Sequence, residues 1–349
     1  MKEVILSIES SCDDTSIAIL EIESIQAIFY RKISQELQHS SYGGVVPELA
    51  SRLHIEVFPK LIEEAVSFIE NSYNLKAIAV TTEPGLSVTL IEGVTVAKAL
   101  ALSFEVPIIS VNHLMGHIYS TFINTKELKE NFLTLLVSGG HTQLLKIGNI
   151  TEIGTFKIIA SSLDDSLGES FDKVSKMLGL GYPGGPIIEK LALDGNENKF
   201  KFSVPLSQSP QIAFSYSGLK NSVRLAIEKE KSEKNFLDEQ FIKDISASFQ
   251  KVAIDHIIQK IKKYLNIQKK QHSMNFKYLS IVGGVSANKY IKNRISDFLM
   301  ESFSINTIYP ELKFCSDNAV MIGRCAIELY YQQEFTPLDK IEIKSKSFF

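Results

Sequence analysis

Two histidines spaced four residues apart are the most informative feature of the chain. His113 and His117 lie in the stretch VNHLMGH, which follows an apolar run typical of a strand and is expected to open a helix. Residues i and i+4 lie on one face of a helix, so both imidazoles can reach a single metal ion. The spacing alone also fits two ordinary histidines near a helix start.

A carboxylate far along the chain is the candidate third ligand. Asp317 lies in the stretch FCSDNA, at the start of a predicted helix that runs to residue 331. Two histidines and one carboxylate bind a divalent metal ion and leave a coordination position open for a substrate. The three residues therefore predict a metal centre with room for chemistry.

Three glycine turns are candidates for holding an anionic ligand. They are SGGHT at 138–142, YPGGP at 182–186 and VGGVSAN at 282–288. Glycine lets the backbone approach a ligand closely and turn N–H groups toward anionic oxygens, and helix N-termini favour phosphate. Each pair alone is a weak signal, because glycine pairs also form plain turns. No Walker A or GxGxxG pattern is present, so a nucleotide is expected in a cleft between two duplicated α/β domains.

Acidic residues accompany these motifs. Asp13 and Asp14 occupy the turn between the first two predicted strands, where paired acids can steer a metal, a phosphate or a proton. Aspartate is also simply common in turns. Asp172 is a candidate acceptor for a ribose hydroxyl, although its spacing favours a helix-surface carboxylate paired with Lys176.

The predicted elements that position these residues follow a repeated pattern. Each half of the chain opens with a hairpin around a small polar turn, and helices and further strands follow. The predicted strands are 4–9, 15–21, 27–33, 77–81, 106–111, 132–137, 142–147, 278–282 and 305–309. The predicted helices are 49–68, 88–103, 168–178, 186–193, 241–265, one beginning at residue 287, and 317–331. Internal duplication of an α/β domain is the economical interpretation.

The domain prediction follows from this repeat. Residues 1–128 are expected to form the N-terminal domain and residues 129–349 the C-terminal domain. The stretch around 195–240 is polar and charged with little periodicity, so we expect an insertion in the second domain.

Composition narrows the class of protein. The chain has 349 residues, 44% of them hydrophobic and 22% charged, as expected of a globular protein with a full core. Its three cysteines (Cys12, Cys315, Cys325) predict free thiols in a reducing cytosol, and the strand-like pattern of the first residues leads us to expect no secretory signal. Charged residues interrupt the apolar region 88–109, which favours a buried helix and strand over a membrane span. A net charge of -3 argues against gripping nucleic acid by bulk electrostatics.

Eight motifs follow one another along the chain: IESSCDDTSIAIL, SSYGGVVPELASRLH, NHLMGH, LLVSGGHTQLL, FDKVSKMLGLGYPGGP, FSYSGLK, IVGGVSANKY and FCSDNAVMIG. Together and in this order they resemble the bacterial tRNA N6-adenosine threonylcarbamoyltransferase family, formerly described as glycoproteases. The resemblance extends from residue 4 to about residue 331 and implies a duplicated actin/Hsp70/sugar-kinase-like (ribonuclease H-like) α/β fold with the active site in the interdomain cleft.

The resemblance assigns roles to individual residues. It implies that His113, His117 and Asp317 bind one Fe2+ or Zn2+ per subunit and that Asp13 is the acid linked to activity. The contacts implied for the donor, threonylcarbamoyl-AMP, come from Leu136, Val137, Ser138, Gly139, Gly140, Asp172, Gly185 and Asn288. One departure is Asp14, where relatives often carry Glu, and the shorter side chain leaves its contacts in doubt.

The implied reaction is a group transfer. The threonylcarbamoyl group passes from threonylcarbamoyl-AMP to the exocyclic amine of the adenosine 3′ of the anticodon, in tRNAs that read codons beginning with A. The implied partners are tRNA, an inert paralogue of the same fold and a small P-loop ATPase, with a cytoplasmic location and no membrane. The apolar faces of the predicted helices 49–68 and 88–101 are the expected docking elements.

Three other functions are weighed against the transferase. A metalloprotease would share the HxxxH spacing, but a zincin places a glutamate between the histidines and this chain has Leu114-Met115-Gly116. A sugar kinase or ATPase of the same fold needs the glycine turns but no His-His-Asp site. A non-enzymatic scaffold for tRNA is conceivable at this low net charge. The metal triad combined with adenylate-binding turns favours the transferase.

Overall fold

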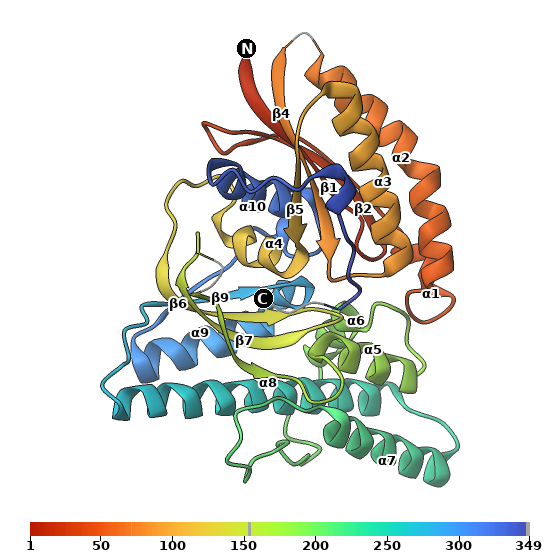
Figure 1. The fold of residues 1–349 in the computed structure, drawn as a ribbon. Helices are drawn as coiled ribbons and strands as arrows, with labels where there is room; N and C mark the ends of the chain where they lie inside the picture. The colour runs from red at the N-terminus through yellow and green to blue at the C-terminus, as the bar shows by residue number, and fades with distance from the viewer. Residues whose placement is uncertain (71, 153–154, 347–349) are drawn as a thin grey trace. The chain divides into compact units, whose positions relative to one another are not determined.

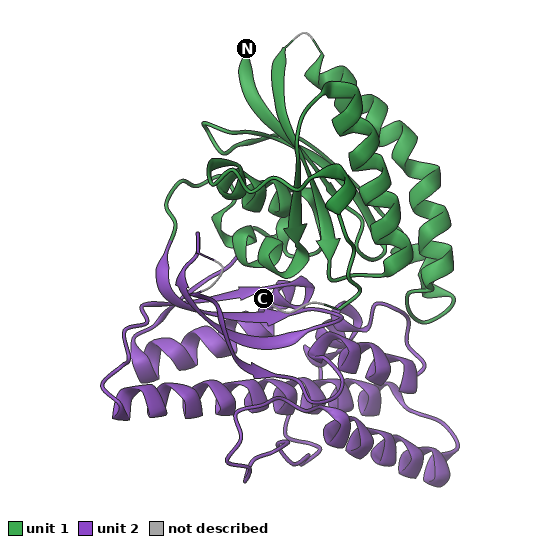
Figure 2. Ribbon diagram, in the orientation of Figure 1, with its two compact units in different colours: residues 1–128, 310–349 green, residues 129–309 purple. Residues whose placement is uncertain are grey.

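Two five-stranded mixed sheets with the same strand order organise the chain. The computed structural model describes residues 1–70, 72–152 and 155–346. Two units result, which Figure 2 shows in different colours: unit 1 holds residues 1–128 and 310–349, and unit 2 holds residues 129–309. Each unit contains one of the sheets and its own apolar core.

The sheet of unit 1 has the order β3-β2-β1-β4-β5 (Figure 1). Strand β1 pairs antiparallel with β2 and parallel with β4, β3 lies antiparallel beside β2, and β5 lies parallel beside β4. The last six residues of β1 are all buried, because helices cover both faces of the sheet. The strands are β1 Lys2–Glu9, β2 Asp14–Glu21, β3 Ala27–Ser34, β4 Tyr73–Glu83 and β5 Ile108–Asn112.

Different helices cover the two faces of this sheet. Alternate residues of β1 point to opposite faces, so Leu6 joins a cluster with α2 and α3 whereas Ser7 contacts α10. The helix α4 packs beside α10. The helices of unit 1 are α1 Glu36–Ser40, α2 Pro47–Ile69, α3 Ser87–Phe104, α4 His113–Tyr119 and α10 Ala319–Tyr331, with 3-10 turns Ser120–Phe122, Leu312–Phe314 and Leu338–Lys340.

The sheet of unit 2 has the order β10-β9-β6-β7-β8. Its core combines apolar residues of the sheet with those of the long helix α8 and the helices around it. The strands are β6 Glu130–Val137, β7 Thr142–Asn149, β8 Lys157–Ser161, β9 Tyr278–Val282 and β10 Asn306–Ile308. The helices are α5 Leu167–Met177, α6 Gly184–Ala192, α7 Ser217–Lys234, α8 Glu239–Lys270 and α9 Lys289–Phe303, with a 3-10 turn at Gly284–Ala287.

The two sheets repeat one topology. Strands β6, β7, β8, β9 and β10 occupy the places that β1, β2, β3, β4 and β5 occupy in unit 1. The pairing directions also agree, since the first three strands of each set are antiparallel and the last two join in parallel. The predicted duplication of an α/β unit is therefore confirmed.

The domain boundaries differ from the prediction at the C-terminus. Residues 129–349 were expected to form one domain, but residues 310–349 belong to unit 1. The reason is the packing of α10 on β1 and β2, where Gly323 approaches Leu20 and Ser7 so closely that a Cβ would lie 2.4 Å from a Leu20 methyl group. Sequence periodicity predicts the helix but not the sheet on which it packs.

The stretch around 195–240 contains more regular structure than the prediction of a polar insertion suggests. It includes the 18-residue helix α7, which buries Leu219, Val223 and Ile227 at intervals of four residues. This narrow apolar stripe is surrounded by charged residues, which conceals its periodicity in the sequence. Strand β8 was likewise not predicted.

Within the described residues, the helix α3 alone is long and apolar enough to cross a membrane. It was predicted to be a buried helix. Its residues Val94, Ala97, Leu100 and Ala101 belong to the apolar core of unit 1, which explains the high hydropathy without a membrane. Length and composition alone are therefore weak evidence for a membrane span.

Candidate functional site

A capping residue sets the position of the histidine helix. Asn112 ends β5, and its side-chain oxygen accepts hydrogen bonds from the backbone N–H groups of Leu114 and Met115. The cap starts α4 at His113, so that His113 and His117 lie one turn apart with ring centroids separated by 4.7 Å. The predicted helix is confirmed, and both rings lie on the same face.

The turn before α10 positions the third residue. The Asn318 side chain caps α10 by accepting from Met321 N–H, and it donates to the backbone oxygens of Phe314 and Ser316. Asp317 lies in the sequence between Ser316 and Asn318, which the last of these hydrogen bonds joins. The fold thus brings Asp317 to the histidines although 200 residues of sequence separate them.

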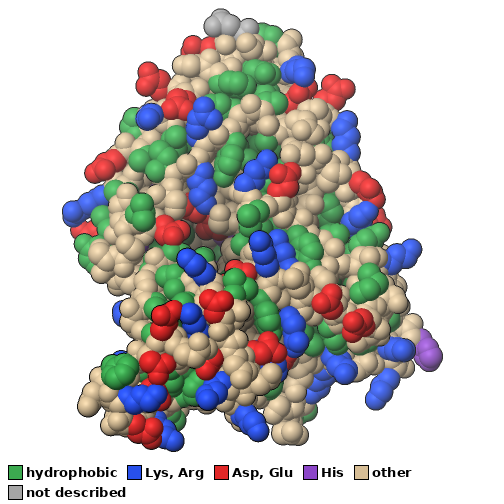
Figure 3. Space-filling model, turned by 180° about the vertical axis from the view of Figure 1, so that it is seen from behind, with side chains coloured by type: hydrophobic (Ala, Val, Ile, Leu, Met, Phe, Trp, Pro, Cys, Tyr) green, Lys and Arg blue, Asp and Glu red, His purple; other side chains and the backbone are tan. Residues whose placement is uncertain are grey.

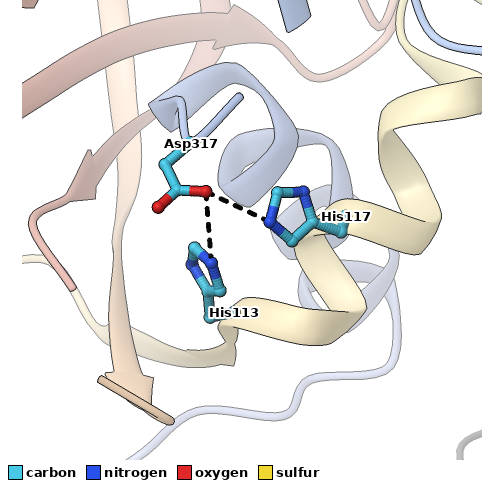
Figure 4. Close-up of side chains that lie close together, drawn as sticks. All are labelled: His113, His117 and Asp317. Carbon is cyan, nitrogen blue, oxygen red and sulfur yellow. Dashed lines mark ion pairs between the residues drawn. The ribbon is translucent and has the colours of Figure 1, made fainter. Parts of the chain in front are cut away.

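His113, His117 and Asp317 form a compact group of ligand atoms (Figure 4). Asp317 Oδ1 lies 3.4 Å from His113 Nε2 and 3.1 Å from His117 Nε2, and one ligand atom from each residue lies within 4.8 Å of the others. Donor atoms of a tetrahedral site with metal bonds of about 2.0–2.1 Å are separated by roughly 3.3 Å. The group therefore has the dimensions of a divalent metal site.

The hydrogen bonding of His117 also fits a metal ligand. Its ring is completely buried, and its Nε2 atom faces the Asp317 Oδ1 atom at 3.1 Å, whereas Nδ1 has no hydrogen-bond partner among the described residues. Buried polar atoms normally find a partner. A metal ion held through Nε2 would satisfy the nitrogen that faces Asp317 (Figure 4).

Glu9 supports His113 from the side away from Asp317. The Nδ1 atom of His113 lies 3.0 Å from Glu9 Oε2 and 3.1 Å from Ser11 Oγ. Glu9 is fully buried, and its carboxylate also accepts from Thr81 Oγ1 and Ser11 N–H. A proton held on Nδ1 by this carboxylate leaves the Nε2 lone pair of His113 free for a metal.

The prediction from sequence missed Glu9. The signal for it is a glutamate at the end of a strand whose central residues are mostly apolar. A buried acid at the end of a strand needs a partner, but the identity of that partner depends on the fold.

The charges of this group are mutually dependent. Burial alone lowers the pKa of His113, but the carboxylates of Glu9 and Asp317 outweigh burial and raise that pKa well above its ordinary value. Burial would raise the pKa of Asp317, yet the two histidines hold it well below its usual range. Burial lowers the pKa of His117. The carboxylates of the buried Glu9 and the partly buried Asp317 thus favour a positive charge at the position that a divalent cation would take.

We expect the substitution Glu9→Gln to weaken metal binding. The amide keeps the shape of the side chain but removes the charge that orients His113, and such supporting residues typically contribute roughly 10–100-fold to metal affinity. A competition titration against a coloured chelator measures the effect. Glu3→Gln, at the exposed start of the same strand, is the control, and unchanged affinity in Glu9→Gln would contradict the supporting role.

A buried histidine forms hydrogen bonds with the acidic turn between β1 and β2. His54 donates through Nε2 to the Cys12 backbone oxygen at 2.9 Å, and its Nδ1 accepts from Thr15 Oγ1 at 2.7 Å. Asp13 is half-buried in this turn. Burial raises the pKa of Asp14 to about 6, with a lowering contribution from Lys32 and a raising one from Asp317. Lys32 contacts both the Asp14 carboxylate and the Asp317 backbone oxygen, so the acidic turn lies near the metal group.

Two glycine turns of unit 2, those that follow β6 and β9, meet at one edge of its sheet. Strands β6 and β9 are parallel neighbours, so the turns that follow them emerge together. Gly283 has a φ of 91°, and a Cβ there would lie 2.4 Å from the Val137 backbone oxygen. A Cβ at Gly168, at the start of α5, would lie 2.6 Å from the Ser138 backbone oxygen. These two glycines allow the segments to pack closely.

Other glycines of the same turns leave open space. A Cβ built on Gly139, Gly140 or Gly185 would meet no atom within 4 Å among the described residues. Gly184 differs, because its Cβ would lie 2.5 Å from the Phe171 backbone oxygen. Gly184 therefore serves packing, whereas the open positions are where a ligand could approach the backbone.

The remaining predicted donor contacts have structural partners. Leu136 and Val137 are completely buried in β6, so any contact they make with a ligand would use backbone atoms. Asp172 accepts from Gly184 N–H at 2.7 Å. The Asn288 side chain caps α9 by accepting from Ile291 N–H and donates to Gln250. Contacts of these side chains with a donor stay predictions.

Comparison with known proteins identifies the family. A family model described as tRNA N6-adenosine threonylcarbamoyltransferase matches residues 27–324. Proteins of that name from Sulfurimonas denitrificans and a Nitratiruptor species are 54% and 53% identical, each over 99% of this chain and over 99% and 100% of the relative. The chain belongs to this family. A Helicobacter pylori member is 51% identical over 99% of this chain and 98% of its own length.

Solved structures support the fold of this threonylcarbamoyltransferase family member. Full-length HypF in a phosphate- and nucleotide-bound form has a TM-score of 0.62 at 14% identity and covers 96% of this chain and 56% of HypF. HypF from T. kodakarensis also has a TM-score of 0.62 at 14% identity, covering 97% of this chain and 49% of its own. With the repeated sheets, these matches support the duplicated actin/Hsp70/sugar-kinase-like α/β fold that was predicted. Nothing in the comparisons favours the metalloprotease alternative.

Proposed function

We propose that the chain transfers a threonylcarbamoyl group from threonylcarbamoyl-AMP to the N6 amine of an adenosine in tRNA. The acceptor is the adenosine 3′ of the anticodon in tRNAs that read codons beginning with A. The observation that carries the proposal is the full-length identity of 54% to a relative of that name. The His-His-Asp group and the open glycine turns support it, since they could hold a metal ion and the donor.

His113, His117 and Asp317 would hold one Fe2+ or Zn2+. When bound, such an ion supplies Lewis acidity and a template for oxygens of the donor. The chain's own contribution is to fix the three ligands, through the Asn112 cap and the Glu9 carboxylate, before substrate arrives. Ligands held in advance need no reorganisation during the reaction.

The glycine turns of unit 2 would hold the adenylate part of the donor. The space beside Gly139, Gly140 and Gly185 allows an adenylate to contact backbone N–H groups. Gly185 is the second residue of α6, where N–H groups point out of the helix start and favour a phosphate.

The reaction exchanges one bond to the carbamoyl carbon for another. The tRNA amine attacks that carbon, the bond to the phosphate oxygen breaks, and AMP leaves with the electron pair. The amine nitrogen must also lose a proton. Asp13, half-buried in the turn between β1 and β2, is the residue that we assign to accept this proton.

Partner proteins would contribute much of the binding affinity for tRNA. Several basic residues that could contact tRNA are engaged within the chain: Lys220 pairs with Asp165, Arg224 pairs with Glu228, and Lys263 donates to the Ser209 backbone oxygen. Figure 3 shows acidic and basic side chains interspersed on the face that it displays. A chain of net charge -3 without a basic stripe is expected to bind tRNA weakly.

Two partners are proposed from the family resemblance: an inert paralogue of the same fold and a small P-loop ATPase. The helices α2 and α3 offer docking surface, because Ile55, Val88 and Ile91 are exposed at 59%, 42% and 52% although most of each apolar stripe lies in the core. Apolar side chains gathered on neighbouring helices are suited to a protein interface.

A transfer assay tests the function and the need for partners together. Purified chain, tRNA and threonylcarbamoyl-AMP are combined with and without the paralogue and the ATPase, and N6-threonylcarbamoyladenosine is measured. We expect product in the complete mixture and weak tRNA affinity for the chain alone over a salt series. Tight binding and repeated turnover by the isolated chain would contradict the need for partners, and no product in the complete mixture would contradict the function.

A further inference from the structure

A lysine joins the acidic turn to the turn that carries Asp317. The ammonium group of Lys32, on β3, lies 2.5 Å from Asp14 Oδ2. It also donates to the Ser316 hydroxyl at 3.0 Å and to the Asp317 backbone oxygen at 2.9 Å. One side chain therefore contacts both turns that surround the candidate metal group.

The contacts of Lys32 use its full donor capacity. An ammonium group has three N–H donors, and the three oxygen atoms of Asp14, Ser316 and Asp317 match that number. The Lys32 side chain is 19% exposed and that of Asp14 is 12% exposed. A pair so far removed from water holds its geometry better than an ion pair on an open surface.

The other side of the Asp317 turn is held by β2 and β1. Ala319 N–H donates to Ser16 Oγ at 3.0 Å, and Ser7 Oγ donates to the Ala319 backbone oxygen at 2.7 Å. Ser16 and Lys32 are register partners on the adjacent strands β2 and β3. Side chains of β2 and β3 thus form hydrogen bonds with the backbone of Asp317 itself and of Ala319, two residues further on.

Charge gives Lys32 a second effect. Asp14 and Asp317 are both acids near the metal group, and like charges brought together repel. The Lys32 ammonium lies between the Asp14 carboxylate and the Asp317 backbone, so it offsets the charge of Asp14. Removal of the lysine alone would remove its hydrogen bonds to the Asp317 turn and would also change the local charge. A test must separate these two effects.

We propose that Lys32 is a positioning residue of the metal centre, which holds the Asp317 turn against the acidic turn and so fixes the third ligand. The proposal rests on the proposed metal site. Lys32 does not touch the ligand oxygen of Asp317 and acts through the backbone of that residue. Asp14 takes the role of its counter-ion.

The test removes the ion pair without changing net charge. In the full-length double variant Lys32→Met with Asp14→Asn, one positive and one negative charge are lost together. The affinity for Zn2+ and Co2+ is measured by competition with a chelator, and the visible absorption of the Co2+ form reports the ligand geometry. We expect metal affinity to fall by on the order of tenfold and the Co2+ spectrum to change.

A neighbouring ion pair provides the matched control. Arg31 is the adjacent residue of β3, on the other face, and it pairs with Glu64 of α2 at 2.9 Å. The charge-neutral variant Arg31→Met with Glu64→Gln should leave both metal affinity and the Co2+ spectrum unchanged. This control distinguishes the loss of the Lys32 contacts with the Asp317 turn from the loss of any ion pair on β3.

The outcomes distinguish this proposal from the proposed metal site. If the Lys32/Asp14 variant binds metal with the affinity and spectrum of the unmodified chain, the positioning role is overturned and the metal site stands. A lower thermal midpoint with unchanged affinity of the folded protein also overturns it, because Lys32 would then serve stability alone. An unmodified chain that binds no metal overturns both proposals.

Discussion

The double variant His113→Ala with His117→Ala is expected to bind no metal and to lose transfer activity by more than about 100-fold, beyond the effect typical of supporting residues. The two imidazoles provide two of the three ligand atoms of the candidate group, and Asp317 alone cannot hold a divalent ion at low concentration. Elemental analysis of the purified protein measures the first effect. The transfer assay with tRNA and threonylcarbamoyl-AMP measures the second.

The controls address histidine content and folding. His272 is exposed at the end of α8, so His272→Ala removes a histidine that has no part in the group and should keep both metal and activity. The rings of His113 and His117 are buried, so a thermal melt is needed to show that the double variant is folded. Full activity of the double variant after exhaustive chelation would contradict a catalytic metal site.

The candidate ligand group could be predicted from the sequence because most of it obeys a local rule. The spacing of His113 and His117 follows from the 3.6-residue period of a helix, and the structure has that helix with an asparagine cap. Asp317 is different, since no spacing rule connects it to the histidines. Its place in the prediction depended on a family motif, and the packing of α10 on β1 and β2 explains how the fold brings it near.

The residues that support the candidate ligands could not be predicted from local sequence patterns. Glu9 and Lys32 lie on strands, and their partners His113 and Asp317 are about 100 and 285 residues away. Whether a polar residue on a strand faces solvent or a buried site depends on what covers that face of the sheet. The same dependence explains the assignment of residues 310–349, since the last helix returns to the first sheet.

Glycine pairs illustrate a second limit. Gly184 and Gly185 are adjacent and equivalent in sequence, yet one is packed against the backbone of α5 and the other faces open space. Composition predicts that a turn forms, but only the three-dimensional surroundings distinguish a packing glycine from one that leaves room for a ligand. This distinction allows a sharper experiment than the sequence did.

The variant Gly185→Val is expected to weaken the binding of a non-reactive threonylcarbamoyl-adenylate analogue by on the order of tenfold or more, while the thermal midpoint stays nearly unchanged. A Cβ at this position meets no described atom within 4 Å, so the apo protein has space for the side chain. Glycine also has a lower helix propensity than valine, so the start of α6 is not weakened. The new side chain would occupy the space that the donor needs, and titration calorimetry measures the loss.

Two further glycine variants turn this expectation into a decisive comparison. Gly218 is the second residue of α7, as Gly185 is of α6, and it also faces open space, so Gly218→Val should leave analogue affinity unchanged. Gly184→Val places a Cβ against the Phe171 backbone oxygen and should lower the thermal midpoint instead, because a backbone atom cannot move aside cheaply. If Gly185→Val binds the analogue as tightly as the unmodified chain does, the YPGGP turn has only a structural role, and the donor must be held elsewhere.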